Sequence, residues 1–215
     1  MHPITNGILS YHMQIQKSDI RKELVKAAEE LFLQKGFQKT SMREIADATQ
    51  VGLGNIYNYF QGKDELFCTI LRPVTSAFEQ MLDSHHGHCG TDIMEMCTET
   101  YLRHSVNEYI SFIRRHRDLM TLLLFRARGS SLENFREDFT DRSTQLVKGW
   151  LADMRHRHPA LAMEVSDFFI HLHSVWMFTL FEEIIMHNVA DGEINGIVAE
   201  YIRFEIIGWR DIMKI

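Results

Sequence analysis

Two asparagines and two tyrosines gather in residues 53–60, where their side chains have the chemistry of a surface that reads nucleic acid. Asn55 and Asn58 can each donate and accept hydrogen bonds, as contacts with the edges of bases require. Tyr57 and Tyr59 carry hydroxyl groups, which commonly bond to phosphate oxygens. Any short helix rich in such residues would look similar, so the composition alone also fits a purely structural role.

The residues on either side extend this candidate surface. Gly52 and Gly54 lack a Cβ and let the main chain come close to a partner. Lys63 and the free amides at the start of the helix that it opens can hold a phosphate. Three more DNA contacts are expected just before the segment: Thr40, Ser41 and Arg43.

Local sequence signals predict the helices that would hold these residues. Ser18 is a candidate N-cap for a first helix, in which apolar residues recur with 3/4 spacing over residues 20–32. Gly36 suits the left-handed position that ends a helix. Ser41 and Glu44 have the spacing of a capping box, which opens a second, short helix.

A turn and a third short helix complete a predicted helix-turn-helix. The second helix ends near Thr49, residues 50–52 form the turn, and the third helix covers residues 53–60. The third helix is the candidate reader, because one α-helix fits the DNA major groove. A fourth helix starts at Lys63 and contains Pro73, which removes a main-chain hydrogen bond and predicts a kink.

Residues 17–66 resemble the DNA-binding domain of the TetR family of bacterial transcriptional regulators. The resemblance is carried by Ala27-Ala28-x-x-Leu31-Phe32, Lys35-Gly36-Phe37, Thr40-Ser41-Met42-Arg43-Glu44-Ile45-Ala46, Val51-Gly52, Gly54-Asn55-Ile56-Tyr57-Asn58-Tyr59-Phe60 and Lys63-Asp64-Glu65-Leu66. It implies a homodimer that binds a double-stranded DNA operator through an N-terminal reader on each protomer. It also implies a helical C-terminal domain that binds a small-molecule inducer, whose identity the resemblance does not supply.

Two positions depart from the family pattern. Gln50 stands where the turn usually has glycine, so we expect it at positive φ at some energetic cost. Leu53 stands where a polar or basic residue is common, and it either touches a thymine methyl group or makes no contact. Both departures leave the operator sequence open.

Composition excludes several other classes of protein. The chain has 215 residues, of which 45% are hydrophobic and 24% charged, which fits one or two folded domains rather than a disordered protein. Three cysteines are too few, and odd in number, for a disulfide scaffold, and they favour the cytoplasm. No apolar run approaches the ~20 residues that span a bilayer, and the first 16 residues do not form a secretory signal. Nucleophile triads, phosphate-binding glycine loops and paired metal motifs are missing from the sequence, so we expect neither an enzyme nor a cofactor.

The net charge of −6 is distributed unevenly along the chain. Residues 17–72 carry nine Lys and Arg against eight Asp and Glu, a net +1, whereas residues 73–215 carry fourteen against twenty-one, a net −7. The acidic balance therefore does not exclude DNA binding by the first part. We predict a mobile arm at 1–16, a helix-turn-helix domain at 17–62 and a helical ligand-binding and dimerisation domain at 63–215.

Hydrophobic periodicity predicts five further helices and therefore an all-α fold. They are expected at 91–114, 117–128, 132–156, 160–188 and 193–213. The last two helices are apolar on most sides, with Ile202 among the apolar residues, and the resemblance places the family's dimer interface on them. Burial within the same chain is the alternative.

Four consecutive or nearly consecutive side chains could bind a metal: His85, His86, His88 and Cys89. We expect them in a loop after the fourth helix, and neighbouring residues rarely point at one centre. A solvated loop is therefore favoured over a zinc site, and no bound metal is predicted.

The second domain has the methionine and phenylalanine content of an adaptable, apolar ligand pocket. The candidate pocket residues are Tyr101, His104, Phe112, Phe125 and His171. His171 and His173 are each either satisfied core histidines or polar fixtures of the pocket. Glu182 and Glu183 are expected to pair with arginine rather than to act in catalysis.

Together these patterns predict a dimeric, ligand-responsive repressor that a small hydrophobic inducer releases from a pseudo-palindromic operator. The alternatives are a metal-sensing regulator that uses the four residues from His85 to Cys89, and a helical small-molecule carrier.

Overall fold

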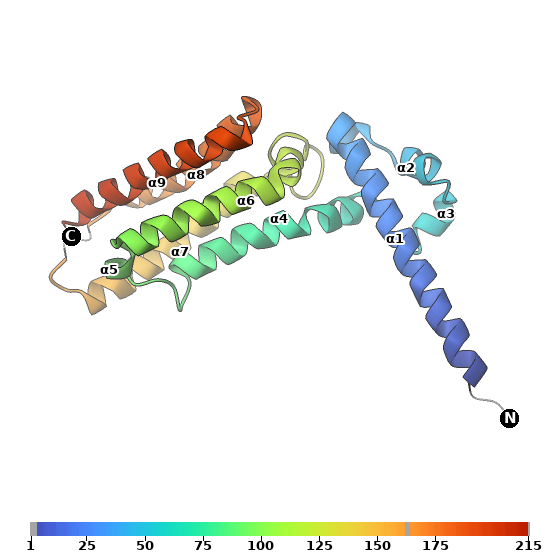
Figure 1. The fold of residues 1–215 in the computed structure, drawn as a ribbon, viewed down its shortest axis with the longest axis horizontal. Helices are drawn as coiled ribbons and strands as arrows, with labels where there is room; N and C mark the ends of the chain where they lie inside the picture. The colour runs from blue at the N-terminus through green and yellow to red at the C-terminus, as the bar shows by residue number, and fades with distance from the viewer. Residues whose placement is uncertain (1–3, 162–163, 215) are drawn as a thin grey trace. The chain divides into compact units, whose positions relative to one another are not determined.

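The regular elements within residues 4–161 and 164–214, which a computed structural model describes, are all α-helices (Figure 1). In chain order they are α1 (Ile4–Lys39), α2 (Met42–Thr49), α3 (Leu53–Ile56), α4 (Lys63–His86), α5 (Ile93–Met96), α6 (Glu99–Phe125), α7 (Phe135–Arg157), α8 (Asp167–Met186) and α9 (Asp191–Met213). The predicted all-α fold is confirmed. The first three residues of the predicted N-terminal arm lie outside the described residues.

The chain forms two compact units. The N-terminal unit contains the residues up to Arg72 together with Thr121–Glu133, and the C-terminal unit contains Pro73–Met120 and the residues from Asn134 onward. The sequence placed a domain boundary at residue 62. The N-terminal unit extends further into α4 because Phe67 belongs to its core.

An aromatic cluster holds the N-terminal unit together. Phe32 packs edge-on against Phe67 with ring centroids 5.0 Å apart, and Phe37 also lies 5.0 Å from Phe67. The three rings are buried, as are Leu24 of α1 and Ile45 of α2. Each such side chain contributes about 1.5–3 kcal/mol by leaving water, so this cluster fixes α1, α2 and the start of α4 to one another.

Gly36 interrupts α1, as predicted, with φ 77° and ψ 165°. A residue with a side chain would be strained at this φ. The next amide, Phe37 N, donates to Arg126 O at 2.9 Å, which ties the segment after α6 into the N-terminal unit.

The predicted capping box opens α2. The Glu44 amide donates to Ser41 Oγ at 3.2 Å, and the Ser41 amide donates to Glu44 Oε2 at 2.8 Å. Gln50 ends the helix with φ 55° and ψ 18°, which confirms the positive φ expected from its place in the turn.

Several helix boundaries differ from those predicted, each for a local reason. No proline interrupts residues 4–39, so α1 begins at Ile4 and Ser18 lies inside it. α3 has four residues instead of eight, because the Asn58 amide bonds to Asn55 O and begins a turn. α6 is one helix instead of two, since residues 99–125 contain neither glycine nor proline. Ser166 caps α8, which therefore begins at residue 167 rather than 160.

Phe78 of α4 lies at the centre of the C-terminal core. Its ring centroid is 4.7–5.7 Å from those of five other phenylalanines: Phe112, Phe135, Phe139, Phe178 and Phe181. α7 and α8 pack along each other beside this cluster. The link from α8 to α9 is held by α6, because Arg117 donates to Val189 O at 2.9 Å and Arg114 donates to Asp191 O at 2.8 Å.

α8 is long and apolar enough, by composition alone, to cross a membrane. The sequence predicted no such segment, because no uninterrupted apolar run approaches the ~20 residues that span a bilayer. The same criterion is met by core helices of folded domains, and Phe178, Phe181 and Ile184 of α8 are buried inside the C-terminal unit.

Candidate functional site

The first candidate site is the surface formed by α2, the turn and α3. Asn55, Tyr57 and Asn58 are exposed, whereas Tyr59 is half-buried. Asn58 Nδ2 donates to Asn55 Oδ1 at 3.2 Å, so the two amides orient each other. The surface thus presents amide and hydroxyl groups that the fold itself does not consume.

Two glycines open the same surface. Gly52 and Gly54 are exposed, and a Cβ added at either would meet no atom of the chain within 4 Å. Nothing inside the N-terminal unit therefore requires glycine there. Leu53 between them is half-buried.

The residues expected to contact DNA from the start of α2 have different surroundings. Thr40 is buried, and its hydroxyl donates to Gly36 O at 2.9 Å. The Ser41 hydroxyl belongs to the capping box, while Arg43 is exposed. Their DNA contacts remain predictions, and Arg43 has the side chain free to make one.

Lys63 has a structural task that the sequence did not reveal. Its Nζ donates to Phe37 O and to Thr40 O, each at 2.8 Å, and lies 4.2 Å from the centroid of the Phe37 ring. Burial lowers the pKa of Lys63, against the opposing effect of Glu44. The ammonium thus joins the start of α4 to the end of α1, and its predicted phosphate contact is untested.

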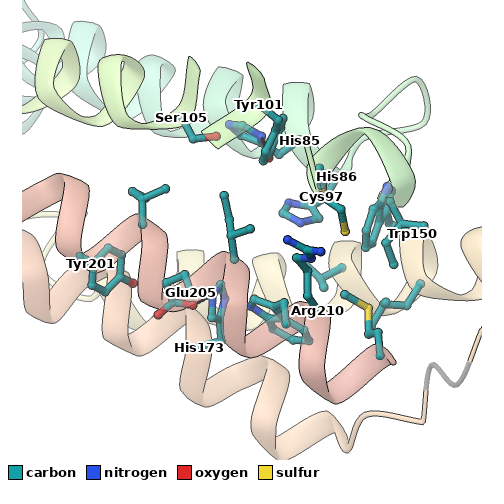
Figure 2. A pocket seen from close by; sticks show the side chains of 18 of the residues that line it. His85, His86, Cys97, Tyr101, Ser105, Trp150, His173, Tyr201, Glu205 and Arg210 are labelled. Carbon is teal, nitrogen blue, oxygen red and sulfur yellow. Dashed lines mark hydrogen bonds and ion pairs between the residues drawn. The ribbon is translucent and has the colours of Figure 1, made fainter. Parts of the chain in front are cut away.

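The second candidate site is a cavity of about 160 Å³ within the C-terminal unit (Figure 2). Each of the helices α4 to α9 contributes to its wall. The wall is largely aromatic and apolar, with Tyr101, Tyr109, Trp150, Tyr201 and Trp209 among its members.

Two clusters of polar side chains, one around His85 and one around Glu205, face this cavity from opposite walls. Tyr101 OH bonds to His85 Nδ1 at 2.5 Å, and His85 Nε2 lies 2.6 Å from Glu108 Oε2. Glu205 of α9 pairs through Oε2 with His173 Nε2 of α8, and its Oε1 is buried without a well-formed hydrogen bond. The cavity therefore combines an apolar wall with a small number of fixed polar atoms, as ligand pockets do.

Burial controls the charge of several cavity groups. Burial lowers the pKa of His86 to about 3, with further contributions from His85 and His173, and its ring packs edge-on against Trp150 at 5.0 Å. His86 is therefore neutral near pH 7. Burial also raises the pKa of the Tyr109 and Tyr201 hydroxyls far above their ordinary value, so both stay protonated.

The predicted pocket residues do not all come together. Tyr101 lines the cavity, whereas His104 is exposed and Phe112 packs in the core against Phe78 and Phe181. Phe125 belongs to the N-terminal unit, at the end of α6. His171 lies 3.7 Å from Asp141 at the surface, because it is two residues from His173 and thus on another side of α8.

Sequence reasoning missed the cavity residues of α7 and α9. No sequence motif or residue spacing singled out Trp150, Glu205 or Trp209. The usable signal was Glu205, an acidic residue at a position that apolar periodicity assigns to the inner face of its helix.

The four residues considered as a metal site have separate surroundings. His85 and His86 belong to the last turn of α4 rather than to a loop, and they face Tyr101 and Trp150. His88 and Cys89 are exposed. Within the part of the chain that the structure describes, no three His, Cys, Asp or Glu side chains form a metal-binding group. Glu182 pairs with Arg136 at 3.6 Å, as expected, and Glu183 with His187 at 3.0 Å instead of an arginine.

The model of the family described as bacterial regulatory proteins, tetR family, matches residues 24–69. This range covers the end of α1, the capped helix α2, the turn and α3. Residues 24–69 therefore form a DNA-binding domain of the TetR family.

Individual TetR-type relatives agree with this family. The HTH-type transcriptional regulator YttP of Bacillus subtilis (strain 168) is 29% identical over 103 residues, which cover 48% of each chain. The HTH-type transcriptional repressor KstR2 of Rhodococcus jostii (strain RHA1) is 39% identical over 56 residues, 26% of this chain and 28% of that protein. The chain spans about half the length of the first curated relatives that it matches. The family and these relatives are transcriptional regulators rather than enzymes.

A solved structure shares the TetR fold. NalD, described as the secondary repressor of the MexAB-OprM multidrug efflux pump in Pseudomonas aeruginosa, superposes with a TM-score of 0.62. The match has 21% identity and covers 88% of this chain and 96% of that chain.

The C-terminal unit also carries exposed apolar side chains on α8 and α9. They are Phe168, Met186, Phe204, Ile207 and Ile212. Ile202, expected at a dimer interface, is instead 5% exposed and lines the cavity.

Proposed function

We propose that the protein is a repressor that binds a pseudo-palindromic operator as a homodimer and releases it when a small, mainly apolar molecule enters the cavity. The observation that carries the proposal is the exposure of Asn55, Tyr57 and Asn58 at α3, the second helix of the helix-turn-helix. Free amide and hydroxyl groups on that helix suit contacts in the major groove. DNA binding also places the protein in the cytoplasm.

The continuity of α4 supports coupling between ligand and DNA. Its first residue, Lys63, is bonded to the main chain of the N-terminal unit, and two residues of its last turn, His85 and His86, line the cavity. A ligand that displaces the end of this helix therefore acts on the element that holds the reader. Release of DNA requires the ligand to bind the DNA-incompetent conformation more tightly.

The exposed apolar side chains of α8 and α9 support dimerisation through a second copy of the chain. Large apolar side chains that are exposed on neighbouring elements suit an interaction surface, and the resemblance places the family's dimer interface on these helices. Phe204, which is 66% exposed, is the residue to test. Phe204→Glu is expected to give a monomer in light scattering, whereas Asn107→Glu on the exposed side of α6 leaves the dimer intact. A wild-type monomer at micromolar concentration would contradict the dimer.

An electrophoretic shift assay with the DNA that flanks the protein's own gene tests the whole proposal. Compounds that raise the thermal stability of the protein are first selected, since a ligand that binds the folded state stabilises it. We expect a protein–DNA complex that contains a dimer, and we expect these compounds to dissociate it. Ligand binding with no preference for any flanking DNA over random DNA would instead identify a small-molecule carrier.

A further inference from the structure

Glu205 brings a charged group into an otherwise apolar cavity. The residue is 9% exposed, its Oε2 is paired with His173, and its Oε1 is buried without a well-formed hydrogen bond, although the Tyr201 hydroxyl interacts with the carboxylate. A buried acceptor without a donor is costly, and such atoms in folded proteins usually have a partner. We propose that the ligand supplies this partner: the cavity takes an organic cation with one ammonium or amidinium group, which binds Glu205, and an aromatic or aliphatic body. This inference rests on the proposed function in taking the cavity as the ligand site.

The rings around Glu205 suit a cation. Tyr201 and His173 lie beside the carboxylate (Figure 2). The ring centroid of Tyr109 is 6.4 Å from that of Tyr201, and the ring centroid of Trp209 is 5.0 Å from that of His173. Aromatic faces attract ammonium groups, most strongly where water is excluded. The ligand's charge is thus met by one carboxylate and by ring faces, while its body fills the apolar remainder.

The positive groups of the protein limit the ligand to one charge. Arg210 is exposed and lies further along α9 than Tyr201 and Glu205, toward Cys97, whose thiol pKa it lowers against the effect of burial (Figure 2). A second cationic group on the ligand would approach Arg210. A ligand carboxylate placed at the Glu205 end would face the Glu205 carboxylate, so anions are disfavoured at that buried end.

The ligand charge is tested with three probes that share one body: 4-phenylbutylammonium, 4-phenylbutan-1-ol and 4-phenylbutyrate. Titration calorimetry on the full-length protein measures each affinity. We expect the ammonium to bind at least tenfold more tightly than the alcohol and the carboxylate to bind most weakly. Glu205→Gln should remove the advantage of the ammonium over the alcohol, whereas Glu200→Gln, a matched change at an exposed position of α9, should leave it intact.

Equal or tighter binding of the carboxylate, or failure of all three probes to bind, would overturn the inference. The comparison on the wild-type protein decides this even where Glu205→Gln does not fold. An ammonium preference that survives Glu205→Gln would also refute the role of Glu205. Operator binding is measured separately with the ammonium probe: tight, Glu205-dependent binding that leaves the DNA complex intact would sustain this inference and contradict the proposed release of DNA.

Discussion

The helix-turn-helix and the cavity place their polar side chains in opposite ways. At the helix-turn-helix the amides of Asn55 and Asn58 face solvent and bond to each other within one turn. In the cavity, Glu205 is buried, its partner His173 is half-buried, and the two come from different helices. The difference teaches that the exposed surface of α3 can be altered without disturbing the fold, whereas the buried cavity residues, as candidate ligand contacts, are also part of the core.

Core truncations test whether the two regions are separate folding units. Phe78→Ala leaves a cavity among five phenylalanine rings, so we expect the C-terminal unit to lose about 3–5 kcal/mol of unfolding free energy. Phe67→Ala should do the same to the N-terminal unit. All three tryptophans, Trp150, Trp176 and Trp209, belong to the C-terminal unit, so fluorescence follows that unit while circular dichroism follows both. If each variant shifts the unfolding midpoints from fluorescence and from circular dichroism by the same amount, the two units unfold together.

Lys63→Met tests whether Lys63 is structural. The variant keeps the apolar stem but removes two hydrogen bonds to main-chain carbonyls, and we expect a loss of about 1–3 kcal/mol in the N-terminal unit. The unfolding midpoint in urea, followed by circular dichroism, measures it. Lys22→Met, at an exposed position of α1, is the control. An unchanged midpoint together with weaker binding to every DNA sequence would assign Lys63 to a phosphate instead.

Asn55→Ala tests whether the amide of Asn55 contacts a base. Loss of the amide should reduce discrimination at one base pair of each half-site by about 1–3 kcal/mol, without moving the unfolding midpoint. Binding to a set of operators with single substitutions measures this loss. Asn107→Ala, outside the N-terminal unit, should alter neither property. A uniform loss across all sequences would show that Asn55 does not read a base.

His86→Phe tests the acid sensitivity of the cavity region. The unfolded chain takes up a proton near the ordinary pKa of 6.5, whereas the folded protein does so only at about pH 3. The unfolded state thus binds more protons between these values, and stability falls as the pH drops from 6.5 toward 3. In His86→Phe, the unfolding midpoint followed by tryptophan fluorescence should decrease less as the pH drops. His88→Phe, at an exposed position, should leave this pH dependence unchanged.

The smallest effect is expected at Glu44. A hydrogen bond from Lys35, followed by those from Ser41, lowers the pKa of Glu44 to about 2. Its stabilising effect is therefore complete above its ordinary pKa of 4.5 and is lost as the pH falls toward 2. Glu44→Gln should slightly reduce the loss of stability of the N-terminal unit at low pH. Glu23→Gln, at an exposed site on α1, should leave this loss unchanged.

The predictability of the two regions follows from the range of their interactions. The capping box of Ser41 with Glu44 and the helix break at Gly36 depend on neighbours within a few residues, so the sequence predicted them. The positive φ of Gln50 was expected from the resemblance to the TetR family. The early end of α3 was missed, because the turn at Asn58 competes closely with a further helical turn. The pairing of Glu205 with His173 depends on how α8 and α9 are rotated against each other, which local periodicity does not specify.

The place of Thr121–Glu133 in the N-terminal unit limits how this protein can be recombined. Beside the link from Phe37 to Arg126, the Ser131 amide donates to Asp64 Oδ1 at 2.8 Å. A chimera that transplants only the chain up to Arg72 onto another sensor would leave both partners behind. A chimera that keeps both contacts must therefore take its N-terminal unit from two separate stretches of the gene, one for the chain up to Arg72 and one for Thr121–Glu133.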